Sequence, residues 1–374
     1  MIQIPIAALK KARTLLGRVR FAQCKLPVLN HILARIDGPN LILAVSDLDR
    51  WLETRIPLGQ PQPYAGPAEF LIPGEALHAA VTADKGSMVI LQPKGRKKHR
   101  ELKLVTISGG MRIESMHATA DWEDFPARPS IEGPTTTLPV ATMAALQAVV
   151  LCASRDEQRN VLQGVYFTPE EGGMLIATDG KHLAGAPAVV PKRKLILPTA
   201  TVRVLGHSDF LAGEVTLTVQ KDKEKHSVSF QIGDHLLITR TVEGSYPNYR
   251  QVVPREQAHT VTIPEDQREG ICKWLRSQKA RAESVCLSID KPGHLTLTQA
   301  DGRGNTIALI TVKVEVQGTS PVISFNPSYL ADAIQIGGIL GLSDEMNPGM
   351  TSSPEGRFCV VMPIRTTASV RSAA

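Results

Sequence analysis

Helical and strand-like hydrophobic patterns alternate along the chain, and their order repeats three times. In the first helical segment, Ile6, Leu9, Ala12 and Leu16 recur at intervals of three and four residues and form one apolar face. Apolar and polar residues then alternate from residue 26 to 56, a pattern typical of paired strands. A second, short helical segment and more strand-like segments follow. The first third of the chain is therefore predicted to form an α+β module.

Prolines mark the repeats. Pro5, Pro139 and Pro264 each stand where a helical pattern begins, at intervals of 134 and 125 residues. A second set precedes the shorter helix of each repeat, at intervals of 125 and 129 residues: Pro73, Pro198 and Pro327. The predicted fold class is α+β, with three repeated modules that each pack two helices on antiparallel sheets.

The length and composition of the chain agree with three modules. With 374 residues, it can be divided at 1–131, 132–256 and 257–374, and each part can bury its own core. A hydrophobic content of 43% and a charged content of 21% are those of an ordinary globular protein. Lys10 and Lys11 follow the first apolar residues instead of preceding them, unlike a secretory signal, and no apolar run is long enough for a membrane helix. We expect a cytoplasmic protein.

The net charge of +6 and the pI near 9.1 permit a polyanionic partner. Aromatic residues make up only 4% of the chain, which argues against a stacking surface for single strands and favours a duplex contacted through its phosphates. The basic run at 94–103 is predicted to be an exposed hairpin tip.

One short turn motif occurs in each repeat. Asp179 and Gly180 follow a strand-like run and have the composition of a tight turn. Asp47 and Asp301 stand in similar frames in the first and third repeats. An ordinary hairpin turn explains each motif taken alone.

Motifs for catalysis and cofactor binding are missing from the sequence. It contains no phosphate-binding Gly-x-x-x-x-Gly-Lys-Ser/Thr loop, and its five cysteines show no Cys-x-x-Cys spacing. Asp179 and His182 could imitate an acid/base pair, but no nucleophile can be identified, so a hydrolase is a minor alternative. We expect a binding protein that is not an enzyme and needs neither cofactor nor metal.

Five short segments, in this order, carry a resemblance to a known family. The segments are Leu-Pro-Val-Leu at 26–29, Ala-Thr-Asp-Gly-Lys-His-Leu-Ala at 177–184, Tyr-Pro-Asn-Tyr at 246–249, Phe-Asn-Pro-Ser-Tyr-Leu at 325–330 and Val-Val-Met-Pro-Ile-Arg at 360–365. With them, the chain resembles the bacterial sliding clamp, the β subunit of DNA polymerase III, over essentially its full length.

The resemblance implies a DNA clamp fold and a non-catalytic role. Members of the family are head-to-tail homodimers, rings of six domains that encircle duplex DNA without reading its sequence. Helices line the hole, and sheets form the outer wall. The implied partners are the polymerase III α subunit, an ATP-driven clamp loader and other proteins with a clamp-binding motif.

Two sets of residues are carried over from the resemblance. The peptide-binding cleft of the family would use Arg159, Leu162, Thr178, Gly180, Lys181, His182, Leu183, Pro247, Val252, Asn326, Tyr329, Met346, Val360, Met362, Pro363, Ile364 and Arg365. The basic residues expected to face DNA are Lys10, Lys11, Arg18, Arg20, Lys25, Arg203, Lys273 and Arg276.

Simpler explanations stay open for parts of this assignment. Leu162, Val252 and Val360 are also compatible with plain core positions. The family often has His-Arg where this chain has Lys181 and His182, and its members are commonly acidic, whereas this chain is basic. A specialised clamp paralogue with altered partners is therefore an alternative, which only peptide selectivity distinguishes from a replicative clamp.

Overall fold

Two long antiparallel sheets organise the chain in a computed structural model, which describes residues 1–19, 26–59, 66–82, 88–96, 99–108, 110–221, 226–278, 283–300, 305–318 and 322–365. Residue contacts divide the chain into two compact units. Unit 1 comprises Met1–Val140 and Arg203–Thr241, and unit 2 comprises Ala141–Val202 and Val242–Ala374. Asp301 and the tail from Thr366 lie outside the described residues.

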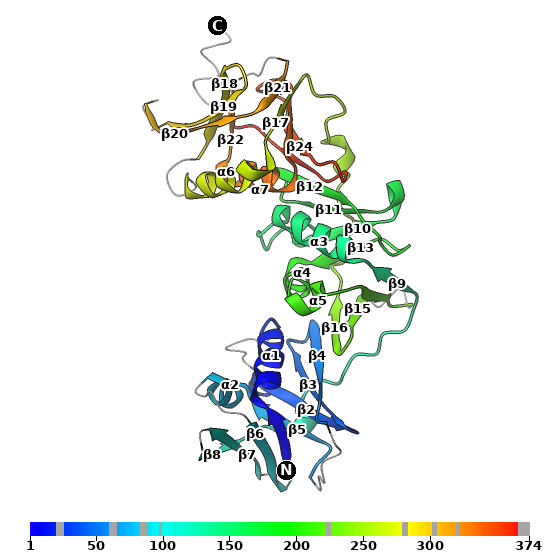
Figure 1. Cartoon of the computed structure of the whole chain (residues 1–374). Helices are drawn as coiled ribbons and strands as arrows, with labels where there is room; N and C mark the ends of the chain where they lie inside the picture. The colour runs from blue at the N-terminus through cyan, green and yellow to red at the C-terminus, as the bar shows by residue number, and fades with distance from the viewer. Residues whose placement is uncertain are drawn as a thin grey trace. The chain divides into compact units, whose positions relative to one another are not determined.

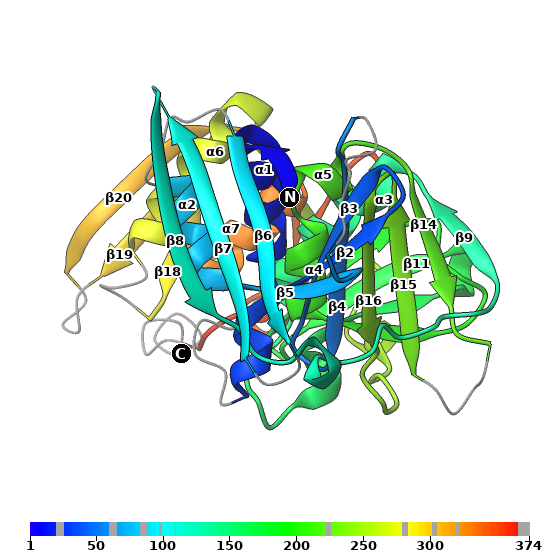
Figure 2. The same ribbon diagram turned by 90° about the horizontal axis from the view of Figure 1, so that it is seen from below.

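Unit 1 contains an eight-stranded and a four-stranded sheet (Figure 1). The larger one has the order β5 (Glu69–Pro73), β2 (His31–Asp37), β3 (Asn40–Ser46), β4 (Arg50–Pro57), β16 (His235–Arg240), β15 (Ser227–Ile232), β14 (Val215–Val219) and β9 (Thr135–Leu138). The smaller one has the order β1 (Ile2–Pro5), β6 (Met88–Arg96), β7 (His99–Ser108) and β8 (Met111–Ala118), of which the last three lie side by side in Figure 2. Its helices are α1 (Ile6–Leu16), α2 (Gly74–Thr82), α5 (Ser208–Leu211), η1 (Pro27–Asn30) and η2 (Trp122–Asp124). The chain passes from unit 2 into unit 1 within helix α4 (Thr199–Leu205).

Unit 2 repeats this plan with a nine-stranded and a four-stranded sheet. The larger one has the order β13 (Leu195–Pro198), β10 (Gly164–Thr168), β11 (Met174–Thr178), β12 (His182–Pro187), β25 (Phe358–Val361), β24 (Gly349–Ser352), β23 (Ile339–Leu342), β17 (His259–Thr262) and β21 (Glu315–Gln317). The smaller one has the order β20 (Thr306–Lys313), β19 (His294–Ala300), β18 (Val285–Lys291) and β22 (Ile323–Phe325). Its helices are α3 (Val140–Val149), α6 (Glu265–Gln278), α7 (Pro327–Ile336), η3 (Val150–Cys152), η4 (Asn160–Leu162), η5 (Glu170–Gly172) and η6 (Tyr249–Gln251).

The strands of the middle repeat are shared between the two large sheets. Strands β14 to β16 continue the sheet of the first repeat, and β10 to β13 continue that of the third. Each large sheet thus joins two predicted modules edge to edge by backbone hydrogen bonds. This arrangement supports three repeats, while the boundaries at residues 131 and 256 stay a prediction.

The helices of the structure follow the predicted apolar faces. In α1, Ile6, Leu9, Ala12 and Leu16 are all buried, as their spacing predicts. Pro5 stands directly before the helix as its N-cap residue, so the predicted start is met to within one residue, but Pro5 itself belongs to a strand. Residues 2–5 form strand β1, because their backbone pairs with that of β6 in an antiparallel register. The helix runs from Ile6 to Leu16.

The basic run at 94–103 belongs to the hairpin of β6 and β7, although residues 97–98 lie outside the described part of the chain. Arg100 forms an ion pair with Asp121 at 2.9 Å, and Lys103 forms one with Glu114 at 2.6 Å. Both basic side chains are mostly buried, with 17% and 21% exposed. The charges of Arg100 and Lys103 are therefore neutralised by carboxylates of unit 1.

The turn motif has the same hydrogen bonds in both units. Asp179 Oδ1 accepts from the amides two and three residues later at 2.8 and 2.9 Å, and Asp47 Oδ1 does so at 3.2 and 2.7 Å. The residue after each aspartate has a positive φ, 88° for Gly180 and 76° for Leu48. Glycine adopts this conformation freely, whereas leucine is strained in it.

We therefore predict that Leu48→Gly raises the free energy of unfolding by about 1 kcal/mol, since the strain of a left-handed leucine disappears. Little burial is lost, because the Leu48 side chain is 55% exposed. The reverse change, Gly180→Leu, should destabilise the protein, because its Cβ would also lie 3.1 Å from the Arg159 guanidinium. Urea denaturation measures both, and a loss of stability in Leu48→Gly would contradict the strain argument.

Candidate functional site

A cavity of about 390 Å³ opens in unit 2 between the turn joining β11 and β12, the first turns of α7 and the segment that follows η3. Most of its lining side chains are polar or charged. It is lined by Leu151, Ala153, Ser154, Arg155, Asp156, Arg159, Asp179, Lys181, His182, Asn326, Ser328, Tyr329 and Asp332.

The first turn of α7 supplies one wall. Asn326 caps this helix, because its Oδ1 accepts hydrogen bonds from the amides of Ser328 at 3.0 Å and Tyr329 at 3.3 Å. Pro327 then occupies the first helical position, where no amide hydrogen is needed. Tyr329 and Asp332 are three residues apart, so the helix presents both side chains on the cavity side.

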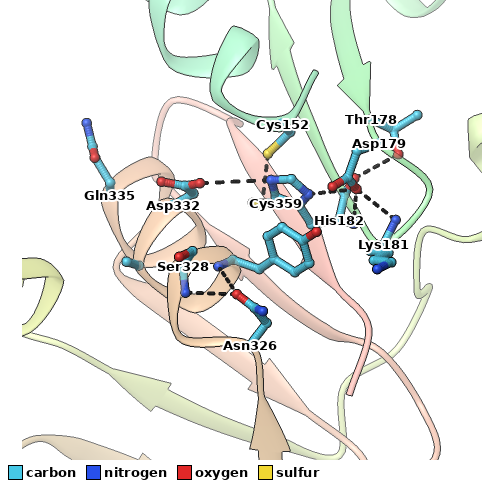
Figure 3. Close-up of polar contacts among 12 residues, drawn as sticks. Cys152, Thr178, Asp179, Lys181, His182, Asn326, Ser328, Asp332, Gln335 and Cys359 are labelled. Atoms are coloured by element: carbon cyan, nitrogen blue, oxygen red, sulfur yellow. Dashed lines mark hydrogen bonds and ion pairs between the residues drawn. The ribbon is translucent and has the colours of Figure 1, made fainter. Parts of the chain in front are cut away.

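His182 forms the floor of the cavity, with only 4% of its side chain exposed. Its Nδ1 lies 2.9 Å from Asp179 Oδ1, and its ring stacks on Tyr329 with centroids 4.1 Å apart. On the opposite side, Nε2 lies 3.9 Å from Asp332 Oδ2 and has no hydrogen-bond partner among the described residues. Figure 3 shows the imidazole between the two carboxylates.

The two carboxylates differ in their electrostatic surroundings. Burial opposes the ionisation of Asp179, but the hydrogen bonds from His182 and Lys181 outweigh it and hold the pKa of Asp179 well below its ordinary value. Burial raises the pKa of Asp332, against the lowering effect of its bond to Arg276. Burial, followed by the nearby Asp179, raises the pKa of Tyr329 to about 12.

This arrangement lacks, among the described residues, the contact between nucleophile and base that a hydrolytic triad needs. A nucleophile would have to give its proton to His182 Nε2, which has no hydroxyl or thiol partner among the described residues. The thiol of Cys152 lies instead 3.7 Å from that of Cys359, and burial raises its pKa, which keeps it protonated. The geometry therefore favours binding over catalysis.

Several known proteins are similar to this chain over nearly its whole length. The β sliding clamp of Caulobacter vibrioides is 27% identical over 382 residues, which cover 97% of this chain and 99% of that protein. The β sliding clamp of Synechocystis is 26% identical, and the similarity covers 91% of this chain and 92% of that protein. No protein-family model matches.

Solved structures give the same result. The Caulobacter crescentus β sliding clamp superimposes with a TM-score of 0.79 at 26% identity and covers 97% of this chain and 98% of its own. The chain is a relative of the bacterial β sliding clamps. The β subunit of DNA polymerase III from Thermotoga maritima, with a TM-score of 0.80 at 20% identity over 98% of this chain and 99% of that one, shares the clamp fold.

Five of the residues carried over from the clamp resemblance lie together in the lining of the cavity: Arg159, Lys181, His182, Asn326 and Tyr329. The guanidinium of Arg159 lies over the turn, where its Nη1 donates to the Asp179 carbonyl at 3.0 Å. Thr178 and Gly180 build the turn itself, because the Thr178 hydroxyl accepts from the Gly180 amide at 3.0 Å.

The apolar residues of the assignment have different surroundings. Leu183 and Val360 are buried in one cluster with Tyr249, so for Val360 the core explanation fits. Val252 and Met362 are instead 47% and 43% exposed, too much for core positions. Leu162 is half-buried, Met346 is 55% exposed, and Pro247 and Arg365 are exposed.

The C-terminal segment is held beside the turn by main-chain hydrogen bonds. The Met362 amide donates to the Lys181 carbonyl at 3.0 Å, and the Ile364 amide donates to the Ser324 carbonyl at 2.7 Å. Pro363 forms an isolated bridge with Phe325. These bonds place the exposed Met362 next to the rim of the cavity.

Motif matching missed Asp332, Arg155 and Asp156, which line the cavity. Helical spacing could have found Asp332, because it follows Tyr329 by three residues on the same helix. The two residues after Ser154 carry no such periodic signal, since the chain is irregular there.

Six of the eight basic residues expected at DNA are described by the structure, and some of these are already paired. Lys273 pairs with Glu269 at 2.6 Å, and Arg276 pairs with Asp332 at 3.2 Å. Lys11 pairs with Asp209 at 3.3 Å, and Lys10 also has a partner. Arg18 and Arg203 are exposed and have no ion pair among the described residues, whereas Arg20 and Lys25 lie outside that part of the chain.

The hydrogen bonds of Asp179 lead to a pH-dependent prediction. In Asp179→Asn, the free energy of unfolding should fall by about 2 kcal/mol at neutral pH, because charge-assisted bonds to His182 and two amides are weakened. Since the folded pKa is depressed, this stabilisation is present above the unfolded pKa of about 4 and is lost as the pH falls below it.

Urea denaturation from about pH 7 to about pH 2 measures this difference in stability between wild type and Asp179→Asn. Asp47→Asn is the matched change in unit 1, where the same two amide bonds occur without a histidine. A difference in stability that stays constant over the whole range would show that ionised Asp179 is not its source.

Proposed function

We propose that this protein is a DNA polymerase processivity factor, a ring-shaped homodimer that encircles duplex DNA and tethers replication proteins. The observation that carries the proposal is the similarity to β sliding clamps over 97% of the chain, in sequence and in fold. The protein acts in the cytoplasm as a non-catalytic subunit, with domains at 1–131, 132–256 and 257–374.

Two exposed sheet edges support ring closure. Strand β8 ends the small sheet of unit 1, and Met111, Ile113 and Met116 on it are 64%, 55% and 49% exposed. Strand β20 ends the small sheet of unit 2, with Ile307 and Leu309 at 52% and 57%. Free strand edges with apolar side chains aggregate unless a specific partner covers them. Pairing of β8 in one protomer with β20 in the other covers both edges and closes a head-to-tail ring.

We predict that Ile113→Asp and Leu309→Asp each convert the dimer into monomers, because a charge at an apolar edge contact remains buried without a partner. Sedimentation equilibrium measures the mass. Val322→Asp is the matched control, since Val322 is 60% exposed beside β22 at the opposite edge of the same sheet. A monomeric wild type, or dimeric edge variants, would contradict ring closure through these strands.

DNA contact in this proposal is weak and independent of sequence. A ring remains on DNA by topology, so its basic side chains need only offset phosphate repulsion. The pairing of Lys11, Lys273 and Arg276 with carboxylates suits such contact, because it limits the attraction. The remaining contacts are assigned to Lys10, Arg18, Arg20, Lys25 and Arg203.

Partner proteins bind at the rim where the polar cavity of unit 2 meets exposed apolar side chains. Met362 and Val252 offer apolar surface, and methionine adapts to different partners. The proposed partners are the polymerase III α subunit, a clamp loader and other proteins that carry a short clamp-binding motif. The cleft is assigned to the 17 residues carried over from the resemblance, of which Val360 is a buried core residue.

Fluorescence anisotropy of a labelled Gln-Leu-Ala-Leu-Phe peptide tests the tethering role. Wild type should bind saturably, and Met362→Asp should weaken binding at least about tenfold, because a charge replaces apolar contact area. Met362→Leu, which keeps the apolar surface, should bind nearly as well as wild type. Absence of binding to folded wild type would instead favour the alternative of a paralogue with other partners.

A further inference from the structure

Helix α5 of unit 1 carries a carboxylate that several basic groups approach. Asp209 lies on this helix, and 9% of its side chain is exposed. Its Oδ1 lies 3.3 Å from the ammonium of Lys11 on α1, the helix that lies beside α5 in Figure 2. Its Oδ2 is buried and has no hydrogen-bond partner among the described residues. One oxygen of this carboxylate therefore holds Lys11, while the other lacks a hydrogen bond.

Two histidines approach the second oxygen. His207 Nδ1 and His235 Nε2 each lie 3.6 Å from Asp209 Oδ2. His207 stands at the start of α5, where its Nδ1 accepts from the Asp209 amide at 3.3 Å, so this nitrogen carries no hydrogen in the neutral ring. His235 lies on β16, and its Nδ1 is 2.9 Å from the Thr54 hydroxyl on β4. A proton on either ring would place a second positive charge beside the carboxylate that holds Lys11.

Burial keeps both histidines neutral near pH 7. It is the largest effect on each ring, and it lowers the pKa of His207 and of His235. The charged groups that act on the two rings from the surrounding elements are Asp209, Asp234, Lys11 and Arg18. The carboxylates oppose the effect of burial, and the basic side chains add to it. At neutral pH, Lys11 is therefore the charged partner of Asp209.

We infer that Asp209 determines how strongly unit 1 attracts DNA, because it withholds the Lys11 ammonium from phosphate. This inference rests on the proposed function, in which Lys11 is one of the residues that face DNA. The Lys11 side chain is 66% exposed, so its ammonium is within reach of a ligand in solution, whereas the carboxylate is fixed in the interior. Removing the charge of Asp209 should therefore free the ammonium for a phosphate contact.

The size of the effect follows from the exposure of Lys11. Water and salt screen an ion pair with an exposed ammonium, so the pair weakens phosphate contact without abolishing it. We expect a change in DNA affinity of about two- to fivefold. One additional phosphate contact also steepens the dependence of log K on log salt concentration by about 0.9.

Protonation of the histidines should release Lys11 in the same way. An imidazolium beside Asp209 Oδ2 competes with the ammonium for the charge of the carboxylate. Because the pKa of both rings is lowered, this competition begins as the pH falls below about 6.5, the ordinary pKa of histidine. The contribution of Lys11 to DNA binding should therefore be small at about pH 7.5 and should grow toward about pH 5.

The test measures binding of the full-length protein to a labelled duplex of about 30 base pairs by fluorescence anisotropy over a series of salt concentrations. At about pH 7.5, Asp209→Asn should bind about two- to fivefold more tightly than wild type, with a salt dependence steeper by about 0.9. Glu214→Gln is the matched control, because it makes the same change of net charge at an exposed position shortly after α5. Its salt dependence should stay within about 0.3 of the wild-type value.

A double-mutant cycle separates this role from a structural one. Lys11→Gln should reduce the salt dependence by about 0.9 in the Asp209→Asn background, and by less than about half of that in the wild-type background. A purely structural role of Asp209 would make the two reductions equal.

A pH series tests the same point without a change at Asp209. The difference in affinity between wild type and Lys11→Gln should grow as the pH falls from about 7.5 to about 5. In the variant that carries both His207→Gln and His235→Gln, the effect of Lys11→Gln should not change with pH, because neither replacement titrates.

The possible outcomes have different consequences. Equal effects of Lys11→Gln in the two backgrounds, or an effect in wild type that does not grow below about pH 6.5, overturn this inference and leave DNA contact intact. Failure of both wild type and Asp209→Asn to bind the duplex overturns the proposed DNA contact and this inference with it. A contribution of Lys11 that appears when Asp209 loses its charge, and that grows on acidification only while the two histidines are present, supports it.

Discussion

The ionised carboxylate of Asp179 is the interaction on which the site of unit 2 depends. It fixes the turn between two buried strands by accepting two backbone amides, and it also orients the His182 ring. The ring is then held against Tyr329 and belongs to the lining of the cavity. The Asp179 side chain therefore both stabilises the hairpin and orients the His182 ring that lines the cavity.

The counterpart in unit 1 shows what this turn does without the histidine. Asp47 makes the same amide bonds, but Arg50 follows where His182 stands, and its guanidinium turns back to Asp47. The same turn, with the same amide hydrogen bonds, thus occurs in two repeats. The third residue after the aspartate differs, being Arg50 in unit 1 and His182 in unit 2. We interpret the turn of unit 1 as purely structural, and we propose that the turn of unit 2 also takes part in binding.

Much of the fold could be predicted from the sequence, because it depends on periodic patterns. The buried face of α1, the capped start of α7 and the repeated Asp turns all follow from local spacing. Strand β1 could not be foreseen, because four residues before a helix gain strand structure only by pairing with β6, about 85 residues away. Helical spacing could have placed Asp332 beside Tyr329, but its approach to His182 at 3.9 Å is purely tertiary and could not be foreseen.

If two protomers enclose DNA, the topology of the DNA decides whether the protein can leave it. The protein would be incubated with nicked circular DNA, a clamp loader complex and ATP, and then passed through gel filtration at high salt. The account predicts that protein stays with the circular DNA and is lost when one restriction cut makes the DNA linear, because a ring slides off an open end. Salt-sensitive binding that is equal on circular and linear DNA would contradict it.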